Sequence, residues 1–383
     1  MIQNKKCIMI IAGETSGDQH GAKLVDKMLA KDPELFFCGM GGEALKAAGV
    51  KDIIDSSKIS IVGITEIFSK LFDIIKNFFR AKRLLKNFRP HLLILIDFPE
   101  FNLALAKTAK KLGIPILYYI SPQIWAWRSK RVKKIKRLVD HIAVILPFEE
   151  EFYRNNNVPV TYVGHPLLDT DQKFDAEIEE DRIIIGLVPG SREKEITNHL
   201  PVMLKAASMI HKNNKKIELS YAMAPGLDQG NILKIIRENA DDLKIEIVTD
   251  GIEKVLKKST LVIAGSGTAT LQTALFGVPM IIIYKMSGIT YMLAKALIKI
   301  ENISLVNLIA GEKIVPELIQ EKAVPESIAA EAEKILNNHS EAAKIREKLL
   351  SLGRLMGEKG ASEKVAEIAF GMMRRERSPA DLI

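Results

Sequence analysis

Cysteines and long apolar runs are scarce in this sequence. Its 383 residues include only two cysteines, Cys7 and Cys38, which are too few for the disulfide framework of a secreted scaffold. The most apolar runs, 91–97 and 279–284, have the length of strands and are too short to cross a bilayer. The apolar segment near the N-terminus spans only about seven residues, which is too short for a typical secretory signal. These absences predict a reduced protein that is soluble or bound peripherally to a membrane.

Acidic residues are outnumbered by basic ones. The chain has 55 Lys and Arg against 47 Asp and Glu, which gives a formal net charge of +8. Such a balance is typical of proteins that bind nucleic acid, an anionic membrane or a phosphorylated ligand. Apolar residues make up 47% and charged residues 27%, as in globular proteins with a sizeable core. The length suggests two domains.

Short apolar runs alternate with longer amphipathic stretches. The runs expected to be strands are 7–12, 35–38, 92–97, 116–120, 142–146, 160–163, 183–188, 217–223, 245–248, 261–264 and 280–284. The stretches expected to be helices include 18–31, 66–88, 101–112, 195–213 and 268–276. Several runs are apolar almost throughout, which is typical of parallel strands buried on both faces. The alternation predicts an α/β protein with doubly wound sheets.

A polar and acidic segment over about 165–182 interrupts this alternation, and a new strand and turn follow it. We interpret the segment as a linker between two Rossmann-like domains, one over 1–168 and one over 169–344. The last 50 or so residues are charged and helical in pattern.

Two turns of the C-terminal half are suited to an anion. "PGSREKE" follows the run 183–188, and its glycine, Gly190, lets the backbone approach a ligand. Ser191 could cap the next helix, whose N–H groups favour an anion, and Arg192 could bind a diphosphate in two places. The alternative interpretation is a plain helix cap with a surface arginine.

The second turn, "GSGTATLQ", follows the run 261–264. Free N–H groups and the helix dipole at this helix start would favour a diphosphate, and Gln272 lies one turn later on the same face. The turn-forming residues are Gly265, Ser266, Gly267 and Thr268. The sequence lacks the lysine of a phosphate-binding P-loop and the third glycine of a dinucleotide fingerprint. A tight helix entry without a ligand is the alternative.

The acids of interest lie in the N-terminal half. Asp97, in "HLLILIDFPEFN", follows a strand and could serve as a general base. Glu14 and Asp18, in "IAGETSGD", lie in a glycine turn after the first strand. Helix capping by Asp97, and charges that complement a helix dipole for Glu14 and Asp18, are the alternatives. Asp18 fits this alternative better than Glu14 does.

Two segments could bind a polyanion. "WAWRSKRVKKIKR" places Trp125 and Trp127 before a basic run, which suggests RNA, but it lacks an RNA-binding signature, and a solvated basic helix is the alternative. The stretch 66–90 instead repeats apolar residues at helical spacing between basic ones, which is typical of a helix on an anionic membrane. A core-facing helix with a basic outer side is its alternative. The residues expected to contact lipid are Phe68, Phe72, Phe78, Phe79, Lys76, Arg80 and Arg83.

Several blocks together resemble the lipid-A-disaccharide synthase family over about residues 8–322. These blocks are "AGETSGD", "SIVGITEI", "IDFPEFN", "YYISPQIWAWRSKRVKKI", "LPFEEEFY", "VGHPLLD", "LVPGSREKEI", "SGTATLQTALFGVPM" and "SLVNLIAGEKIVPELIQ". The resemblance implies a GT-B glycosyltransferase with two Rossmann-like domains facing across a cleft. It also implies that helices over about 345–383 return to the N-terminal domain, and that a homodimer can form by exchange of C-terminal segments.

The implied reaction joins UDP-2,3-diacylglucosamine to 2,3-diacylglucosamine 1-phosphate (lipid X). It releases UDP and forms a β-1,6-linked disaccharide 1-phosphate, with inversion and without a metal or other cofactor. The implied location is the cytoplasmic face of the inner membrane, as a peripheral protein that binds no nucleic acid.

The resemblance also assigns roles to residues. It implies Asp97 as the base for the acceptor hydroxyl and Glu14 as a second essential acid, with Ser16 and Gly17 shaping the acceptor side. The implied donor-side residues are Gly190, Ser191, Arg192, Gly265, Ser266, Gly267, Thr268, Gln272, Asn307, Glu317 and Gln320. Many family members carry Glu at position 272 to bind the ribose hydroxyls, so Gln272 would bind ribose without a charge. A UDP-sugar epimerase of the same fold and a nonenzymatic RNA-binding protein are the rival interpretations.

Overall fold

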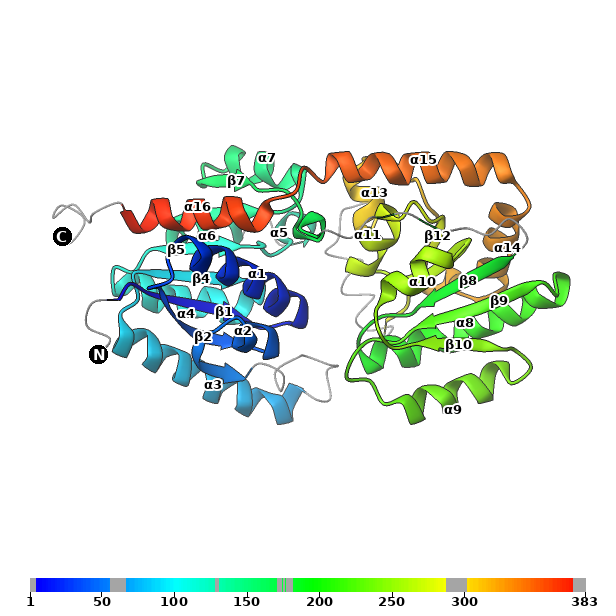
Figure 1. The fold of residues 1–383 in the computed structure, drawn as a ribbon, viewed down its shortest axis with the longest axis horizontal. Coiled ribbons are helices and arrows are strands. Elements are labelled where there is room, and N and C mark those ends of the chain that lie inside the picture. Colours follow the sequence, from blue (N-terminus) through cyan, green and yellow to red (C-terminus); the bar gives the residue numbers. More distant parts are fainter. Residues whose placement is uncertain are drawn as a thin grey trace. The chain divides into compact units, whose positions relative to one another are not determined.

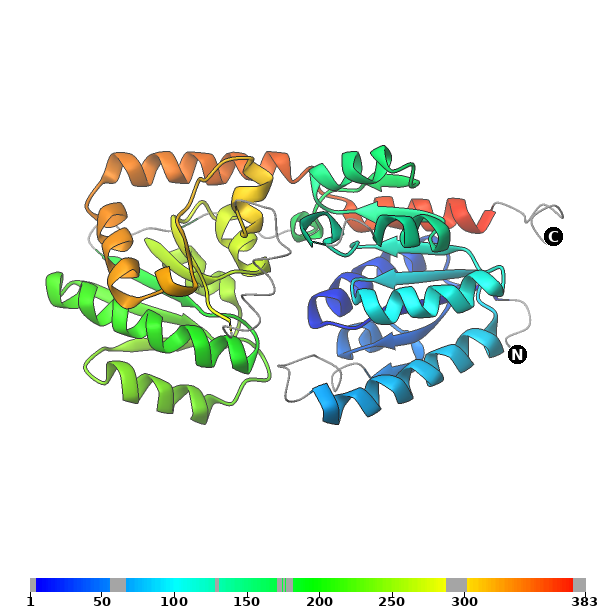
Figure 2. The ribbon, with the colours of Figure 1, turned by 180° about the vertical axis from the view of Figure 1, so that it is seen from behind.

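The chain folds into two compact units. A computed structural model describes residues 5–55, 67–127, 131–170, 174, 176, 182–286 and 302–374, with the backbone alone at 52, 67–71 and 126–127. Unit 1 consists of Met1–Thr170 and Met356–Ile383, and unit 2 consists of Asp171–Leu355 (Figures 1 and 2). The chain returns to unit 1 at residue 356 rather than near 345, because α15 (His339–Leu355) packs on α11 (Thr268–Leu275) and α14 (Pro325–Leu336) of unit 2.

Unit 1 is built around a parallel sheet of seven described strands in the order β3-β2-β1-β4-β5-β6-β7. The strands are β1 (Cys7–Ala12), β2 (Phe36–Gly41), β3 (Lys51–Asp55), β4 (Leu92–Ile96), β5 (Ile116–Tyr119), β6 (His141–Val144) and β7 (Val160–Tyr162). The helices are α1 (Thr15–Lys31), α2 (Glu43–Ala47), α3 (Ile67–Phe88), α4 (Pro99–Lys111), α5 (Ile124–Trp127), α6 (Val132–Leu138), α7 (Pro147–Asn155) and α16 (Ala361–Arg374), with a 3-10 turn at Pro166–Leu168.

Helices cover both faces of this sheet. Alternate residues of β1 divide between them, because successive side chains of a strand point to opposite faces. Ile8 and Ile10 pack with buried residues of α1 and α16, whereas Met9 and Ile11 pack with those of α3, α4 and α6. The uniformly apolar strands in the sequence are therefore explained by burial on both faces.

Unit 2 repeats this plan with six described strands in the order β10-β9-β8-β11-β12-β13, all parallel. The strands are β8 (Ile183–Val188), β9 (Ile217–Ala222), β10 (Ile245–Val248), β11 (Leu261–Gly265), β12 (Met280–Tyr284) and β13 (Glu317–Ile319). Its helices include α8 (Glu193–Asn213), α9 (Gln229–Ala240), α10 (Ile252–Lys258), α11 (Thr268–Leu275), α13 (Leu305–Ala310), α14 (Pro325–Leu336) and α15, with a 3-10 turn at Gln320–Lys322. The prediction of two Rossmann-like α/β domains is confirmed.

A carboxylate of unit 1 caps the start of the C-terminal helix α16. Asp169 accepts hydrogen bonds from the backbone N–H groups of Gly360 (2.8 Å), Ala361 (3.0 Å) and Ser362 (2.8 Å). These are the N–H groups at a helix start, which have no partners within the helix. The pairing places α16 against α1, so the sheet of unit 1 is covered by a segment that follows unit 2 in the sequence.

The two cysteines are free and buried in unit 1. Their sulfur atoms lie 3.9 Å apart on neighbouring strands, and this contact lowers the pKa of the Cys7 thiol against the opposing effect of burial.

Candidate functional site

The two predicted acids lie together at the carboxyl edge of the unit 1 sheet. β1 and β4 are adjacent, with Ala12 opposite Ile96, and the strand order reverses between them. Glu14 follows β1 and Asp97 follows β4. In open parallel sheets this reversal point is where ligands bind. Both acids are half-buried and both have interaction partners.

The backbone at Asp97 is unusual. Asp97 and Phe98 both have positive φ angles, 44° and 45°, a region that costs a non-glycine residue about 1 kcal/mol or more. Buried Asn102 donates from Nδ2 to the carbonyls of Ile96 (3.1 Å) and Asp97 (2.7 Å). The Tyr118 hydroxyl also donates to the Asp97 carbonyl, at 2.6 Å. The sequence did not predict these supports, which fix the direction in which the Asp97 side chain leaves the main chain.

The glycine turn after β1 packs closely on the turn after β4. A Cβ atom on Gly13 would lie 2.4 Å from Cγ of Phe98, so only glycine fits under that ring. Gly17 is also in close contact, since a Cβ atom there would lie 3.3 Å from Cγ2 of Ile96. Ser16 is half-buried in the first turn of α1, next to Glu14 at its N-cap.

Asp18 lies in the first turn of α1, where its charge was expected to complement that helix. Its carboxylate, however, accepts hydrogen bonds from the N–H groups of Gly42 (2.5 Å), Ala44 (2.9 Å) and Leu45 (3.3 Å). Asp18 therefore caps the neighbouring helix α2, and its role in "ETSGD" is structural.

Unit 2 presents a matching edge with different residues. β8 and β11 are adjacent, with Val188 opposite Ala264, and the strand order reverses between them too. "PGSR" follows β8 and "SGT" follows β11, so the two turns that the sequence predicts to bind an anion lie side by side. A Cβ atom on Gly265 would lie 2.5 Å from the Pro189 carbonyl oxygen, so glycine permits this close approach.

The first of these turns is capped by a residue that the sequence did not single out. Glu195 Oε2 accepts hydrogen bonds from the N–H groups of Ser191 (3.0 Å) and Arg192 (3.3 Å), and its Oε1 lies 3.4 Å from Nη1 of Arg192. The prediction that Ser191 caps the helix is therefore wrong, because Arg192 is the N-cap and Glu195 supplies the capping carboxylate. Gly190, at φ 135°, leaves room for that carboxylate.

The second turn opens α11 at Thr268, with Gly267 as its N-cap. Gly267 and Thr268 are exposed, and N–H groups at a helix start have no partners within the helix. The N–H group of Ser266 instead donates to the Ile283 carbonyl at 3.1 Å.

Gln272 is half-buried one turn into α11. Its Nε2 atom is 3.5 Å from Oε1 of Glu253 on α10. A carboxylate therefore lies beside the residue that was expected to contact ribose. It pairs with the amide nitrogen of Gln272 and not with its carbonyl oxygen.

Asn307, Glu317 and Gln320 hold main chain in place. Asn307 is fully buried, donates to the Val315 carbonyl and Glu317, and accepts two backbone N–H groups, at Ile314 and Val315. These four bonds use the donors and the lone pairs of its carboxamide, and its position lining the donor pocket stays a prediction.

The other two predicted donor-side residues have similar roles. Glu317 accepts hydrogen bonds from the N–H groups of Ile303 (2.8 Å) and Ser304 (3.1 Å) at the start of α13. Gln320 exchanges two bonds with the backbone of Met286, at 2.7 and 3.1 Å. In this structure both side chains shape the chain around the sheet edge.

Trp125 is part of the unit 1 interior. Its indole N–H donates to Oε1 of Glu149 at 3.1 Å, and its ring meets Phe148 edge to face at 4.7 Å. Burial raises the pKa of Glu149 to about 7, against hydrogen bonds from Trp125, Leu146 and Ser121. A half-buried indole with these contacts is no free platform for stacking RNA bases.

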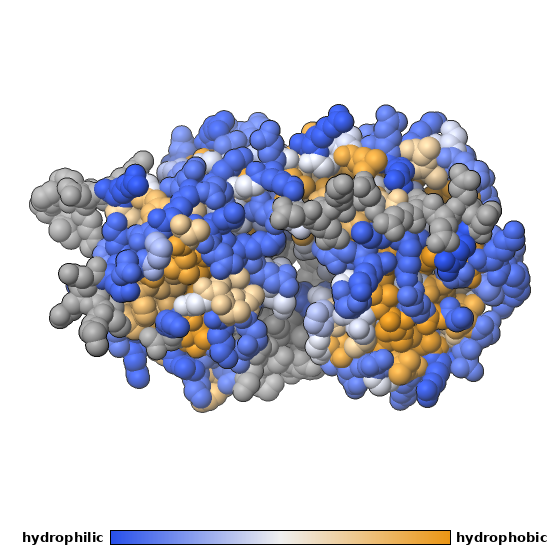
Figure 3. Space-filling model, in the orientation of Figure 1, coloured by the Kyte–Doolittle hydropathy of each residue, from blue (hydrophilic) through white to orange (hydrophobic). Residues whose placement is uncertain are grey.

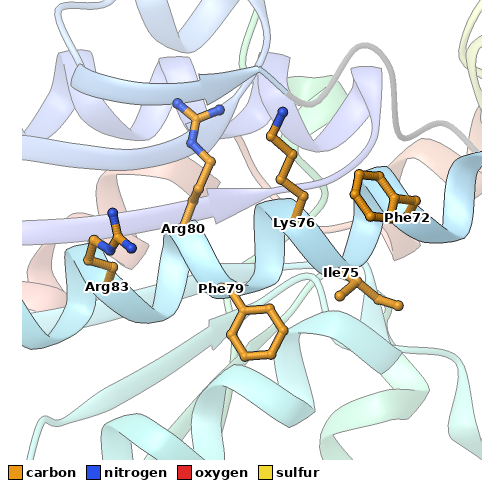
Figure 4. Close-up of a pocket in the computed structure, with 6 residues that line it drawn as sticks. All are labelled: Phe72, Ile75, Lys76, Phe79, Arg80 and Arg83. Atoms are coloured by element: carbon orange, nitrogen blue, oxygen red, sulfur yellow. The ribbon is translucent and has the colours of Figure 1, made fainter.

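The surface of α3 carries the predicted lipid-contacting residues (Figure 4). Phe72 is 72% and Phe79 61% exposed, which is rare for phenylalanine, and Ile75 lies between them. Lys76, Arg80 and Arg83 lie beside these apolar side chains on the same face of the helix. We call these six residues the α3 patch.

Two expected members differ. Phe78 was predicted to face lipid, but it is half-buried and packs edge to face on Phe101 of α4, with ring centres 5.5 Å apart. The Phe68 side chain and most of the "SIVGITEI" block lie outside the described residues.

Hydrophilic residues cover much of the face in Figure 3, with smaller apolar areas between them. Over the described ranges, no helix has the length and apolar character needed to cross a membrane. Nor does the described part of the chain contain a group of three or more His, Cys, Asp or Glu side chains that could hold a metal ion.

Comparisons with known proteins agree with this arrangement. The solved UDP-GlcNAc 2-epimerase from Neisseria meningitidis, bound to UDP-GlcNAc, has a TM-score of 0.62 at 12% identity, with 95% of this chain and 99% of that one covered. The calicheamicin glycosyltransferase CalG4 has a TM-score of 0.62 at 13% identity, with 98% of this chain and 100% of that one covered. These likenesses concern the fold alone and place it in the GT-B class.

Sequence comparison is more specific. A lipid-A-disaccharide synthase of Syntrophus aciditrophicus is 43% identical over 380 residues, which cover 97% of this chain and 99% of that protein. The relative from Geobacter metallireducens is 42% identical, with 97% of this chain and 98% of that protein covered. The family described as lipid-A-disaccharide synthetase matches residues 8–369. The chain therefore belongs to the lipid-A-disaccharide synthetase family.

Proposed function

We propose that this protein is a lipid-A-disaccharide synthase. It transfers 2,3-diacylglucosamine from UDP-2,3-diacylglucosamine to the 6-hydroxyl of 2,3-diacylglucosamine 1-phosphate, and it releases UDP. The observation that carries the proposal is family membership over residues 8–369, combined with acids at one sheet edge and anion-ready turns at the other.

Unit 2 binds the UDP part of the donor in this proposal. Negative charge grows on the diphosphate as the glycosidic bond breaks, and preorganised N–H groups and cations stabilise such charge. In this proposal Arg192, the Ser266 hydroxyl and the N–H groups of Gly267 and Thr268 contact the diphosphate. The support is that their turns follow β8 and β11, which are adjacent strands. Gln272 accepts a ribose hydroxyl with its carbonyl oxygen. The residues need no metal or other cofactor for these contacts.

Unit 1 supplies the acids for the acceptor. Asp97 takes the proton of the 6-hydroxyl while that oxygen forms a bond to the anomeric carbon of the donor. The bond from that carbon to the UDP oxygen breaks in the same step, so one displacement inverts the configuration. Glu14 stabilises the positive charge that develops on the sugar. The support of Asp97 by Asn102 and Tyr118 is favourable for such a role, because it limits the directions that the carboxylate can take.

The α3 patch contacts the anionic inner-membrane surface, at its cytoplasmic face, in this proposal. Exposed aromatic side chains beside Lys and Arg are the chemistry that binds a lipid interface. A peripheral position would let acyl chains stay in lipid while the sugar head groups react. An assembly of two chains belongs to the same proposal, and light scattering in solution measures it.

The test is direct. The purified protein is incubated with both lipid substrates, and the disaccharide 1-phosphate and UDP are measured by mass spectrometry, with and without EDTA. Equal amounts of both products, unchanged by EDTA, are expected. UDP without disaccharide, or epimerisation of UDP-GlcNAc in a parallel reaction, would contradict the proposal and favour hydrolysis or the epimerase interpretation.

A further inference from the structure

His199 is a buried histidine that the proposed mechanism does not use. It lies on α8, two turns after Arg192, and is only 2% exposed. Its Nδ1 atom is 2.7 Å from the Pro189 carbonyl oxygen, and its Nε2 atom is 3.1 Å from the backbone nitrogen of Lys285. Both ring nitrogens are therefore paired with main chain.

These two partners define the protonation state of the ring. The N–H group of Lys285 can only donate, so Nε2 must accept and cannot carry a proton. The Pro189 carbonyl can only accept, so Nδ1 must carry the proton and donate it. The geometry requires a neutral imidazole with its proton on Nδ1.

The ring lies where three strands end. Pro189 follows β8 and begins the "PGSR" turn, Gly265 ends β11, and Lys285 follows β12. A Cβ atom on Gly265 would lie 3.0 Å from Nδ1 of His199, which shows how closely the ring approaches the second turn. Movement of this ring would therefore change the spacing between the two anion-ready turns.

Both backbone segments that His199 contacts are held in place by other side chains. Gln320 binds the backbone of Met286, next to Lys285, so the chain after β12 has a defined position. Glu195 binds the N–H groups of Ser191 and Arg192, and these hydrogen bonds make the "PGSR" turn locally rigid. His199 joins these two pieces through the Pro189 carbonyl.

We propose that His199 is a positioning residue for the donor diphosphate. It fixes the position of the "PGSR" turn relative to the "SGT" turn, so that Arg192 and the N–H groups at the start of α11 can bind the same diphosphate. This rests on the proposed function, in which unit 2 binds UDP. An apolar side chain could fill the same volume but would leave the Pro189 carbonyl and the Lys285 N–H unpaired, and the turn would move to find other partners.

Three variants test this role. His199→Leu removes both hydrogen bonds, and His199→Gln keeps one donor and one acceptor. His211→Leu is the matched control, because His211 lies near the other end of α8 and its Nδ1 is 3.3 Å from the Ile217 carbonyl oxygen. UDP affinity is measured by calorimetry, KM is measured for each substrate, and thermal unfolding reports stability.

The expected result is specific to the donor. His199→Leu should weaken UDP binding and raise the donor KM by about tenfold or more, with little change in the acceptor KM. His199→Gln should recover most of the affinity. His211→Leu should lower stability yet bind UDP as the wild type does. A folded His199→Leu variant with wild-type UDP affinity would overturn the inference, and so would a loss of affinity in the control equal to that in His199→Leu.

Two further outcomes separate the inference from the proposed function. If the wild-type protein does not bind UDP, the donor assignment of unit 2 fails and the role of His199 fails with it. If UDP binds, nitrogen NMR of the wild-type protein labelled at histidine, assigned with the His199→Gln variant, reads the ring directly. A proton on Nδ1 and a resonance shifted by UDP are expected. A proton on Nε2, or a resonance unchanged by saturating UDP, would contradict the inference even if His199→Leu does not fold.

Discussion

The two sheet edges of this protein share one topology and carry opposite chemistry. In each unit the strand order reverses between the first and fourth strands, and two turns meet there. The edge of unit 1 carries Glu14 and Asp97, with two successive residues at positive φ. The edge of unit 2 carries glycines, hydroxyls and Arg192, with N–H groups at helix starts. The fold fixes where a ligand binds, and the residues of the turns decide what the ligand is.

The comparison also predicts different effects for substitutions at the two edges. Changes at the unit 1 edge should slow the chemical step and leave UDP binding intact. Changes at the unit 2 edge should weaken UDP binding first. Measuring both quantities on one variant from each unit distinguishes the roles.

The largest effect is expected from Asp97→Asn. Loss of a general base typically costs about 10²–10⁴-fold in rate, so kcat should fall in this range. UDP affinity should stay at the wild-type value, because Asp97 belongs to the other unit. Glu100→Gln, an exposed carboxylate on the first turn of α4, is the control and should keep most of the activity. Near wild-type turnover by Asp97→Asn would remove Asp97 as the base.

The second effect concerns stability and is confined to unit 1. Burial lowers the pKa of His20 to about 4, and the charge of Lys23 lowers it further. Burial likewise lowers the pKa of His165 to about 3, with His20 as a further cause, and Asp169 opposes both shifts. The unfolded chain binds these protons near pH 6.5, so stability falls as the pH drops below that value. The loss between pH 7 and pH 5 should be about 2–4 kcal/mol.

Urea unfolding at both pH values, followed by Trp125 and Trp127 fluorescence, measures that loss, since both tryptophans lie in unit 1. His165→Asn is expected to flatten the pH dependence of unfolding, even if it lowers stability at pH 7. An equal pH dependence in the wild type and this variant would show that acid sensitivity comes from other groups.

The third effect tests the edge of unit 2. Arg192→Met removes a cation from the diphosphate, and charge-assisted hydrogen bonds contribute about 1.5–3 kcal/mol, so UDP should bind about 10–100-fold more weakly. Arg237→Met, at a surface arginine of α9, changes the same charge without touching either turn. Calorimetry compares the two, and equal UDP affinities would place the diphosphate elsewhere.

The smallest effect concerns the α3 patch. Replacing Phe72 and Phe79 with Ser should reduce binding to vesicles of anionic lipid by about tenfold, because two exposed aromatic side chains are lost. Activity on substrate in detergent should change little. Phe78→Ser serves as a contrast, since this half-buried ring packs on Phe101 and its loss should lower stability. Vesicle sedimentation and thermal unfolding distinguish the two, and unchanged sedimentation of the double variant would exclude the patch as the docking surface.

Much of the fold could be predicted because buried parallel strands leave a direct pattern in sequence. The runs 7–12, 183–188 and 280–284 coincide with β1, β8 and β12 to the residue. The edge strands β3 and β13 were not predicted, since charged residues interrupt their apolar pattern, as strands at a sheet edge can tolerate.

The candidate site was predictable only in part. Turn residues at strand ends were identifiable, because glycine and hydroxyl residues stand out beside apolar runs. Asn102, Glu195 and His199 were not, because their partners are backbone groups that sequence spacing does not reveal. Asn307 was expected to line the donor pocket, and its hydrogen bonds to Glu317 and to the backbone of Ile314 and Val315 could not be read from the sequence either.

The return of the chain to unit 1 has a consequence for synthesis. α16 covers apolar residues of α1 and β4, yet the whole of unit 2 is translated before α16. At a typical 5–20 residues per second this delay is on the order of 10 s, long compared with the folding of a small domain. Unit 2, which is continuous in sequence, can complete its fold first. The nascent N-terminal unit would meanwhile expose to chaperones the apolar residues that α16 covers, until Asp169 pairs with the start of α16.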